Sequence, residues 1–405
     1  MSKGGRRGWG IWDVAFVMVS VAALALSFWL HLRFGDGLLE RISSDSMDIH
    51  ADFDTFWQSA ETVWTGGSVY DTGARLLNLN PPFWAVLLSP LALLEPLEAY
   101  RVFVLITLVM VVGYLAWMAG EVRLRGGWAV VAGVMLLLSS PLMATIALGQ
   151  MYPVLALGLV AAWWADHKGA RIASGVALGL TLAIKPTLAP VILWPIMRRR
   201  WDTLGAAIVS GAAATLVGAM VLGTRATMEY VSVLDRATVS GYWDNASIPG
   251  MASRLFTDNG FIEPIVALPG ALPVAFTVGI VVIIVTAVRL TRETEYGAEV
   301  GLWTMVAAAL LASPVTWHNY LLLLGPGVIL LLARGKTALA FLLLSLQFIP
   351  PSWPELWRED GTILSALALT LYTFILFAHW LAFLTFGDEK PAEPDPASDL
   401  SPDTA

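Results

Sequence analysis

The sequence lacks cysteine and has little charge. None of its 405 residues is a cysteine, which excludes disulfides, thiolate metal sites and cysteine nucleophiles. Charged residues make up 14% of the chain and hydrophobic residues 57%, whereas soluble domains carry about 25% charged residues. The net charge of −7 disfavours a nucleic-acid-binding protein. Because the apolar residues also fall in long blocks, a soluble enzyme and a disordered scaffold are excluded, and we expect an all-α polytopic membrane protein.

The common cofactor-binding motifs are also missing. No Walker loop, Rossmann glycine pattern, G-x-S-x-G or His-x-x-x-His pair occurs in a usable context. The D-x-D pair of Asp52 and Asp54 has the form of a metal–nucleotide motif, but it falls in a segment predicted to lie outside the cytoplasm, away from nucleotide sugars. We therefore predict no cofactor and no metal site, although the two carboxylates could share a divalent ion.

The apolar segments predict about 12 transmembrane helices. The first follows three basic residues, has no small-residue cleavage site and is interpreted as a retained span rather than a signal peptide. The segment 81–97 is short and broken by Pro90 and Pro96, so we place it at the membrane interface. The predicted spans are 11–30, 100–120, 128–148, 151–165, 172–184, 187–197, 203–222, 265–288, 301–312, 319–333, 337–349 and 363–386.

The positive charges agree with this path. With 12 spans, the N- and C-termini both lie in the cytoplasm, and 15 of the 24 Lys and Arg residues fall on the cytoplasmic side, as the positive-inside rule requires. Residues 1–386 are predicted to form a single transmembrane domain of the cell membrane, with long outer loops at 32–99 and 223–264. The proline-rich, acidic segment 387–405 is predicted to be a disordered cytoplasmic tail.

Two predicted spans are too short to cross a bilayer. Segments 172–184 and 187–197 would be only about 20 Å and 16 Å long at 1.5 Å per residue. They meet at Lys185-Pro186, where the proline disfavours a continuous helix. A lysine at such a corner either faces a wet cavity or a counter-ion, or extends its side chain to the interface.

The first outer loop combines acids with aromatic residues. Phe53, Phe56 and Trp57 fit one face of a short interfacial helix that holds Asp52 and Asp54 at its N-terminal end. A carboxylate there could accept a proton from a sugar hydroxyl, and aromatic faces suit sugar rings. Capping of the helix explains one of these acids, Asp54 in particular, equally well.

Other polar residues that need an explanation occur at the outer ends of predicted helices. Arg254 is suited to one phosphate group or to a surface ion pair. His318 could be a general acid, a hydrogen-bond donor or an ordinary interfacial histidine. Gln150 and Asn245 complete the set of polar groups on this side.

Six sequence blocks, taken in order, resemble glycosyltransferase family 87. Each block is loose, but together they span about two thirds of the chain in the order typical of that family. They are ADFDTFWQSAETVWTGGSVYD (51–71), LNPPFWAVLLSPLALL (79–94), ALGQMYPVLALGL (147–159), SGVALGLTLAIKPTLAPVILWPIMRRRW (174–201), NASIPGMASRLF (245–256) and SPVTWHNYLLLL (313–324).

The resemblance implies a C-type glycosyltransferase fold and an extracytoplasmic active site. Its implied partners are a polyprenyl-phosphate sugar donor, with mannose foremost, and a glycolipid or glycan acceptor in the cell envelope. The implied product is α-linked, formed with inversion. Asp52 matches the essential acid of the family better than Asp54. The implied site consists of catalytic Asp52, Asp54 and His318, and of donor-binding Lys185, Arg254, Gln150 and Asn245.

A transporter or lipid flippase is the main alternative from another class. The sequence has no evident inverted repeat, and few ionisable residues fall in the middle of predicted spans, which disfavours transport. The sugar, the acceptor, the linkage and the oligomeric state are not determined by the sequence.

Overall fold

The computed structural model describes residues 10–34, 38–124, 126–236, 238–291, 297–350 and 363–386. Helices, turns and connecting segments make up this part of the chain, with an isolated antiparallel bridge between Asn245 and Trp317 and no strand, so the predicted all-α class is confirmed. The predicted tail at 387–405 lies outside the described residues. The helices are α1 (Ile11–Phe34), α2 (Leu38–Ile42), α3 (Ala51–Thr65), α4 (Pro82–Leu88), η1 (Leu91–Leu93), α5 (Pro96–Glu121), α6 (Gly126–Leu137), α7 (Ser140–Leu148), α8 (Tyr152–His167), α9 (Arg171–Ile184), η2 (Pro186–Ile192), α10 (Leu193–Met197), α11 (Trp201–Arg236), α12 (Ile248–Phe256), α13 (Ala271–Leu290), α14 (Gly297–Ala312), η3 (His318–Leu324), α15 (Gly325–Ala333), α16 (Thr337–Leu346) and α17 (Ile363–Phe386).

Five helices of the described chain are long and apolar enough to cross a membrane. They lie within α1, α5, α11, α13 and α17, and the bent pair of α6 and α7 could form a sixth span. Further apolar helices of 10–17 residues pack between them, including α9, α16 and the end of α14. The number of 12 spans stays a prediction, because these short helices are not placed relative to a bilayer.

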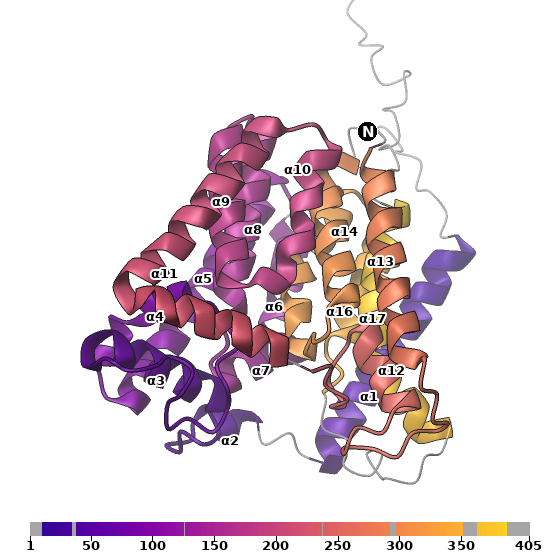
Figure 1. The fold of residues 1–405 in the computed structure, drawn as a ribbon. Helices are drawn as coiled ribbons and strands as arrows, with labels where there is room; N and C mark the ends of the chain where they lie inside the picture. The colour runs from indigo at the N-terminus through magenta and orange to yellow at the C-terminus, as the bar shows by residue number, and fades with distance from the viewer. Residues whose placement is uncertain are drawn as a thin grey trace, which may run out of the picture.

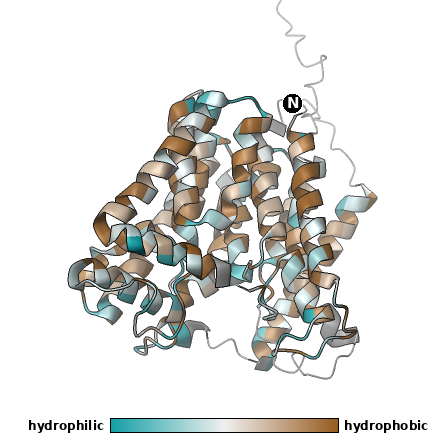
Figure 2. Ribbon diagram, in the orientation of Figure 1, coloured by the Kyte–Doolittle hydropathy of each residue, from teal (hydrophilic) through white to brown (hydrophobic). Residues whose placement is uncertain are grey.

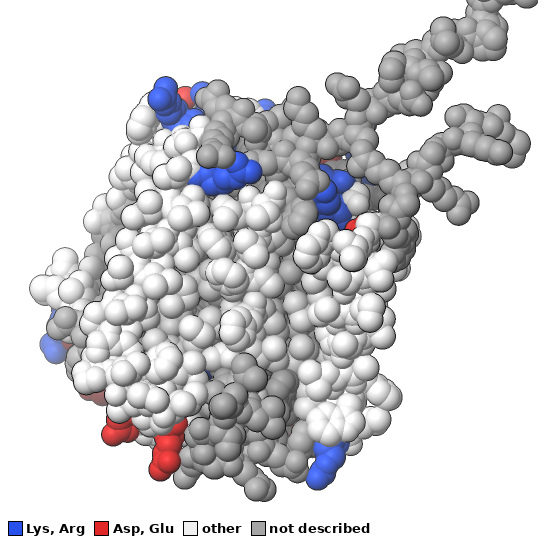
Figure 3. Space-filling view, turned by 90° about the vertical axis from the view of Figure 1, so that its right-hand side faces the viewer, with Lys and Arg blue, Asp and Glu red and all other residues white. Residues whose placement is uncertain are grey.

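The surface of the bundle carries charge at its two ends. Figure 3 shows most of the coloured Lys and Arg residues toward the upper end, and Asp, Glu and further basic residues toward the lower end, with a broad surface between them that is largely uncharged. Figure 2 shows the same separation in the ribbon, where hydrophilic residues lie mainly at the upper and lower ends. An uncharged belt of this kind is the surface that a helical membrane protein presents to lipid.

α14 lies at the centre of the core. Every residue from 300 to 311 is buried, and Trp303, Leu310 and Leu311 have no exposed surface. A helix that is apolar on all sides is stable either inside a protein core or against lipid, so a buried helix such as α14 has the same sequence pattern as a membrane span. The following η3 and α15 are also almost wholly buried, so they place His318, the first residue of η3, in the interior.

The two short predicted spans form a hairpin. α9 ends at Ile184, and the chain returns through the 3₁₀ helix η2 and the short α10. The corner is Lys185, whose extended backbone (φ −136°, ψ 84°) separates the two helices, as expected for a residue before proline. Because α9 alone is only 14 residues long, the corner lies partway along the bundle rather than at its end (Figure 1).

The second outer loop is more helical than the sequence suggested. The first part of the predicted outer loop 223–264 is helical, because α11 bends at Gly223 (φ 83°) and continues as a helical arm to Arg236. In Figure 1 this arm crosses the lower part of the molecule above α3. The arm contains no proline, and an Arg225–Glu229 ion pair (2.9 Å) at helical spacing supports it.

Candidate functional site

α3 positions the first acid of the site. Its apolar face, with Phe53, Phe56 and Ala60, is buried, and this spacing of three and four residues fixes the helix against α4 and α5. Asp52, in the first turn, is turned toward the interior, where Gln150 hydrogen-bonds its carboxylate. Burial raises the pKa of Asp52 to about 6, although the Gln150 hydrogen bond and the charge of Lys185 lower it.

Gln150 reaches Asp52 because of the turn that ends α7. Gly149 closes that helix in the left-handed conformation (φ 72°, ψ 45°). A Cβ atom at this position would lie only 2.3 Å from the Cβ of Phe53, so only glycine allows the turn to lie against α3. Gln150 itself is buried, and its Oε1 has no hydrogen-bond partner among the described residues.

Lys185 faces the same acid from the corner of the hairpin. Its Nζ donates a hydrogen bond to Asn80 Oδ1 (2.9 Å) and lies 5.9 Å from the ring centre of Tyr320. Asn80 is held in turn by Asn78, whose Oδ1 accepts from Asn80 Nδ2 (3.1 Å). The lysine therefore lies among internal polar groups. This position favours the predicted counter-ion or cavity over a side chain that only extends to the interface.

Asp54 lies apart from this group. Its carboxylate accepts a hydrogen bond from Gln58 Nε2 (2.9 Å), one turn further along α3. Residues two apart on an α-helix point in directions about 200° apart, so Asp52 and Asp54 cannot both face one ligand. The described residues contain no cluster of three or more His, Asp or Glu side chains that could hold a metal ion.

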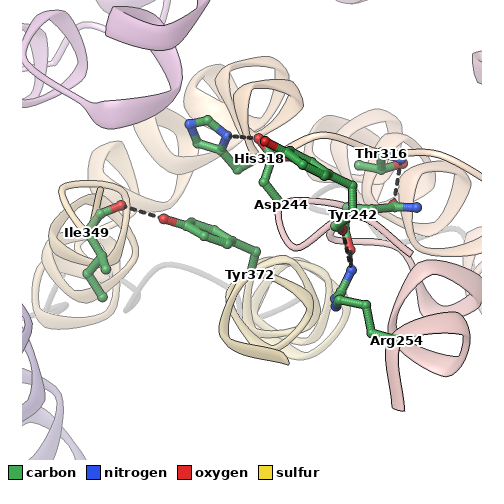
Figure 4. A network of polar contacts seen from close by, with 8 residues as sticks. Tyr242, Asp244, Arg254, Thr316, His318, Ile349 and Tyr372 are labelled. Carbon is green, nitrogen blue, oxygen red and sulfur yellow. Dashed lines mark hydrogen bonds and ion pairs between the residues drawn. The ribbon is translucent and has the colours of Figure 1, made fainter. Parts of the chain in front are cut away.

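A second acid, Asp244, lies beside His318. Its Oδ2 is 2.7 Å from His318 Nδ1, and both side chains are largely buried (Figure 4). The charge of Asp244 acts on Asp52 and raises its pKa, so the two acids belong to one site. Asp244 is not among the site residues predicted from the sequence. In the sequence it is one of several loop acids, and only the contact with a residue 74 positions away distinguishes it.

Arg254 supports the turn that carries Asp244. From α12, its Nη1 donates to the carbonyl oxygens of Tyr242 (2.9 Å) and Asn245 (2.8 Å), on either side of Asp244. The guanidinium is fully buried, and burial lowers its pKa to about 10 while the charge of Asp244 raises it. Its Nε and Nη2 have no partner in the described part of the chain.

Asn245 binds two backbone segments together. Its Nδ2 donates to the carbonyl oxygens of Ser240 (2.8 Å) and Pro314 (3.0 Å), and its Oδ1 accepts from the amides of Ser247 (3.2 Å) and Thr316 (2.9 Å). These four bonds use the full capacity of an amide side chain. The Asn245 side chain therefore has no free donor or acceptor for the predicted contact with sugar or phosphate. Its hydrogen bonds favour a structural role.

The arrangement defines a helical membrane protein with a partly buried acid–cation site. Asp52, Gln150, Lys185, Asp244 and His318 come from five segments that are distant in the sequence. A carboxylate with a raised pKa, next to a lysine and buried hydrogen-bonding groups, can accept a proton while a neighbouring anion leaves.

The chain belongs to glycosyltransferase family 87. A sequence profile of that family matches residues 78–314, more than half of the chain. This range contains four of the predicted site residues (Gln150, Lys185, Asn245 and Arg254) and Asp244, whereas Asp52, Asp54 and His318 fall outside it.

Comparison with known proteins gives relatives of the same kind. The chain is 28% identical, over 72% of its length and 71% of the relative, to a polyprenol-phosphate-mannose-dependent alpha-(1-2)-phosphatidylinositol mannoside mannosyltransferase of Mycobacterium tuberculosis strain H37Rv. It is 44% identical to an alpha-(1->3)-arabinofuranosyltransferase of M. tuberculosis strain CDC 1551, over only 12% of this chain and 11% of that protein. The crystal structure of ArnT from Cupriavidus metallidurans bound to undecaprenyl phosphate covers 93% of this chain and 77% of its own, with 14% identity and a TM-score of 0.43.

Proposed function

We propose that this glycosyltransferase moves a hexose, with mannose foremost, from a polyprenyl-phosphate donor to a hydroxyl group of a glycolipid or glycan. The observation that carries the proposal is the surroundings of Asp52. Its carboxylate is bonded to Gln150, faces the charge of Lys185 and has a pKa of about 6 because of burial. A base with this pKa is ionised at neutral pH and still accepts a proton effectively.

The proposed reaction is a single displacement with inversion. The acceptor oxygen forms a bond to the anomeric carbon while its proton passes to Asp52. The bond from that carbon to the phosphate oxygen breaks, and its electron pair stays on the released polyprenyl phosphate. Inverting glycosidases need a second carboxyl group to protonate the leaving oxygen. A phosphate leaves as a stable anion, so a cation can stabilise it instead.

A groove next to Lys185 supports a lipid-linked donor. It has a volume of about 380 Å³ and lies between the start of α4, the hairpin of α9 and η2, and α11. Pro81 and Pro186 line the groove and directly follow Asn80 and Lys185, which are hydrogen-bonded to each other. An apolar chain in this groove would bring an attached phosphate to Lys185.

Lys185 suits the donor phosphate better than Arg254 does. The lysine is only partly buried and has one hydrogen bond to a neutral amide, so its charge is available to a ligand. Arg254 has no exposed surface and donates to two backbone carbonyls. We therefore assign phosphate binding to Lys185, with His318 as a second donor, and assign support of the Asp244 turn to Arg254.

The proposal also includes the identity of the sugar and the side of the membrane on which transfer takes place. The mannosyltransferase relative supports mannose, and glucose or arabinose remain alternatives for the same assay. In Figure 1, α3 and α7 lie in the lower part of the bundle, whereas α10, which ends next to Arg198 of a predicted cytoplasmic loop, lies in the upper part. This placement supports an extracytoplasmic active site.

Transfer assays test the proposal directly. Purified protein in nanodiscs is incubated with a panel of labelled polyprenyl-phosphate sugars and acceptor glycolipids. We expect transfer that does not depend on an ion gradient. Asp52→Asn should lower the rate by about 10²–10⁴-fold, the contribution of one positioned base. Asp71→Asn, a change of an exposed acid in the same loop, is the matched control and should keep the wild-type rate.

Two results would overturn the proposal. Counterflow of a free solute without sugar transfer would identify a transporter. Retained transfer in Asp52→Asn together with loss in Asp54→Asn would show that the wrong acid is assigned as the base. Size-exclusion profiles of all variants separate a loss of activity from a loss of folding.

A further inference from the structure

The two oxygens of the Asp244 carboxylate have different surroundings. Oδ2 lies 2.7 Å from His318 Nδ1, whereas Oδ1 is buried and lacks a hydrogen-bond partner among the described residues. Only 3% of the His318 side chain and 13% of the Asp244 side chain are exposed. A carboxylate in this position is costly to bury, and the contact with His318 compensates for part of that cost.

The backbone on either side of Asp244 is tightly held. Arg254 Nη1 bonds the carbonyl oxygens of Tyr242 and Asn245, the residues two before and one after it. The Thr316 backbone amide donates to Asn245 Oδ1 (2.9 Å), and the Ala246 backbone amide donates to the Thr316 carbonyl oxygen (2.6 Å). These bonds join the Asp244 turn to the segment that immediately precedes His318. The two side chains therefore have a fixed separation.

This geometry determines which ring nitrogen faces a ligand. An ionised carboxylate accepts hydrogen bonds and donates none, so the Nδ1 of His318 carries the hydrogen that lies between them. Nε2 points away from Asp244, is buried, and has no partner in the part of the chain that the structure describes. The His318 ring also contacts Tyr372, at 5.3 Å between ring centres. Figure 4 shows this ring with one nitrogen toward Asp244 and the other free.

We propose that Asp244 is a positioning residue that acts through His318. It fixes the hydrogen on Nδ1 and the orientation of the ring, so that Nε2 is presented to the donor phosphate that Lys185 also binds. When Nε2 carries a proton, Asp244 balances the positive charge of the ring. The inference rests on the proposed function, because the phosphate belongs to the polyprenyl-phosphate donor. The turn at 242–245 then holds the Asp244 carboxylate in place.

A double-mutant cycle tests the coupling. The variants are Asp244→Asn, His318→Ala and the double variant, assayed for kcat and KM with polyprenyl-phosphate mannose. We expect Asp244→Asn to lower kcat on the order of 10²-fold, the scale of losing one oriented donor to the developing charge. If Asp244 acts only through His318, the double variant is no slower than His318→Ala. Multiplied losses in the double variant would overturn the proposal.

The matched control is Asp258→Asn. This acid lies in the same outer segment, is exposed, and loses the same charge on substitution. We expect it to keep the wild-type kcat and KM. A loss equal to that of Asp244→Asn would point to a general effect of charge and contradict the proposed role.

A spectroscopic measurement on His318 does not depend on activity. Protein labelled with ¹⁵N-histidine should show a His318 signal with Nδ1 protonated, and the Asp244→Asn variant should lose this preference. A wild-type signal with the hydrogen on Nε2 alone refutes the proposal. If the wild type has the expected tautomer but transfers no sugar from any lipid-linked donor, the proposed function fails and the Asp244–His318 pair stands.

Discussion

Asp52 and Asp54 are two residues apart on α3, yet their carboxylates meet different surroundings. Asp52 lies against Gln150 and near Lys185, whereas Asp54 bonds Gln58 on its own helix. The difference follows from helix geometry, because side chains two positions apart do not share a face. On the proposed function, it is therefore the environment and not the residue type that makes Asp52 the base.

The pKa of Asp52 predicts the acid limb of the activity profile. Asp52 must be ionised to accept the hydroxyl proton, and burial raises its pKa to about 6. We therefore expect kcat/KM to fall below about pH 6 and to level off above it. The pH dependence of kcat/KM with a lipid-linked donor measures this limb.

Two substitutions should move this limb in opposite directions. Lys185→Met removes a positive charge that lowers the pKa of Asp52, so the limb should shift to higher pH. Asp244→Asn removes a negative charge that raises this pKa, so the limb should shift to lower pH. A limb that stays in place in both variants would mean that Asp52 is not the titrating base.

Several residues of the candidate site can be proposed from the sequence. Asp52 and His318 follow from their places at the outer ends of predicted helices and from the family resemblance, and Lys185 follows from the corner before Pro186. The structure places all three among internal polar groups. Asp244 was not selected, since its role depends on a contact across 74 residues. Asn245 was selected for its polar side chain, but its amide is fully used by backbone groups, which no sequence pattern reveals.

At the scale of helices, the site depends on where two helices end and a third begins. α7 ends in the left-handed turn at Gly149, α9 ends at Lys185-Pro186, and η3 begins at His318. The first two ends can be predicted from the sequence, because Gly149 and Pro186 mark them. The predicted span 203–222 ends next to the bend of α11 at Gly223, but the helix beyond the bend was not predicted, because a glycine is compatible with either a bend or the end of a helix.

Gly149→Ala tests the turn that presents Gln150. The left-handed conformation costs a residue with a Cβ about 1–2 kcal/mol, and the new Cβ would also collide with Phe53. We expect a clear fall in Tm and reduced transfer. Gly169→Ala is the matched control, since Gly169 has a similar φ of 75° but open space around it.

Gly169→Ala should be destabilised only by the cost of the left-handed backbone conformation. A fall in Tm as large as that of Gly149→Ala would mean that the close approach to Phe53 adds nothing. Thermal unfolding of both variants in the same detergent makes the comparison, with the wild type as reference.

At the scale of the whole molecule, charge and apolar surface divide the bundle into two ends and a belt. Glu121 pairs with Lys168 (2.6 Å) and Asp166 pairs with Arg198 (3.0 Å) at one end, and the proposed site lies toward the other. The membrane class could be predicted from composition alone. The number of spans could not, because buried helices such as α14 are as apolar as lipid-facing ones.

The absence of native cysteine makes the orientation testable. Ala170→Cys and Asp71→Cys introduce single thiols at exposed positions on the two sides of the predicted path. In intact cells we expect an impermeant maleimide to label residue 71, and to label residue 170 only after permeabilisation. The reverse pattern would place the proposed site in the cytoplasm. The unmodified chain, which has no cysteine, supplies the background.

The groove beside Lys185 is lined almost entirely by apolar residues of α4, α9, η2 and α11. On the proposed function, both the donor and the released polyprenyl phosphate therefore travel within the plane of the bilayer. The relevant concentration is the mole fraction of donor among the surrounding lipids, and the spent carrier competes for the same groove. Dilution of the sample in water would leave the rate unchanged, whereas dilution of the donor with other lipids would lower it.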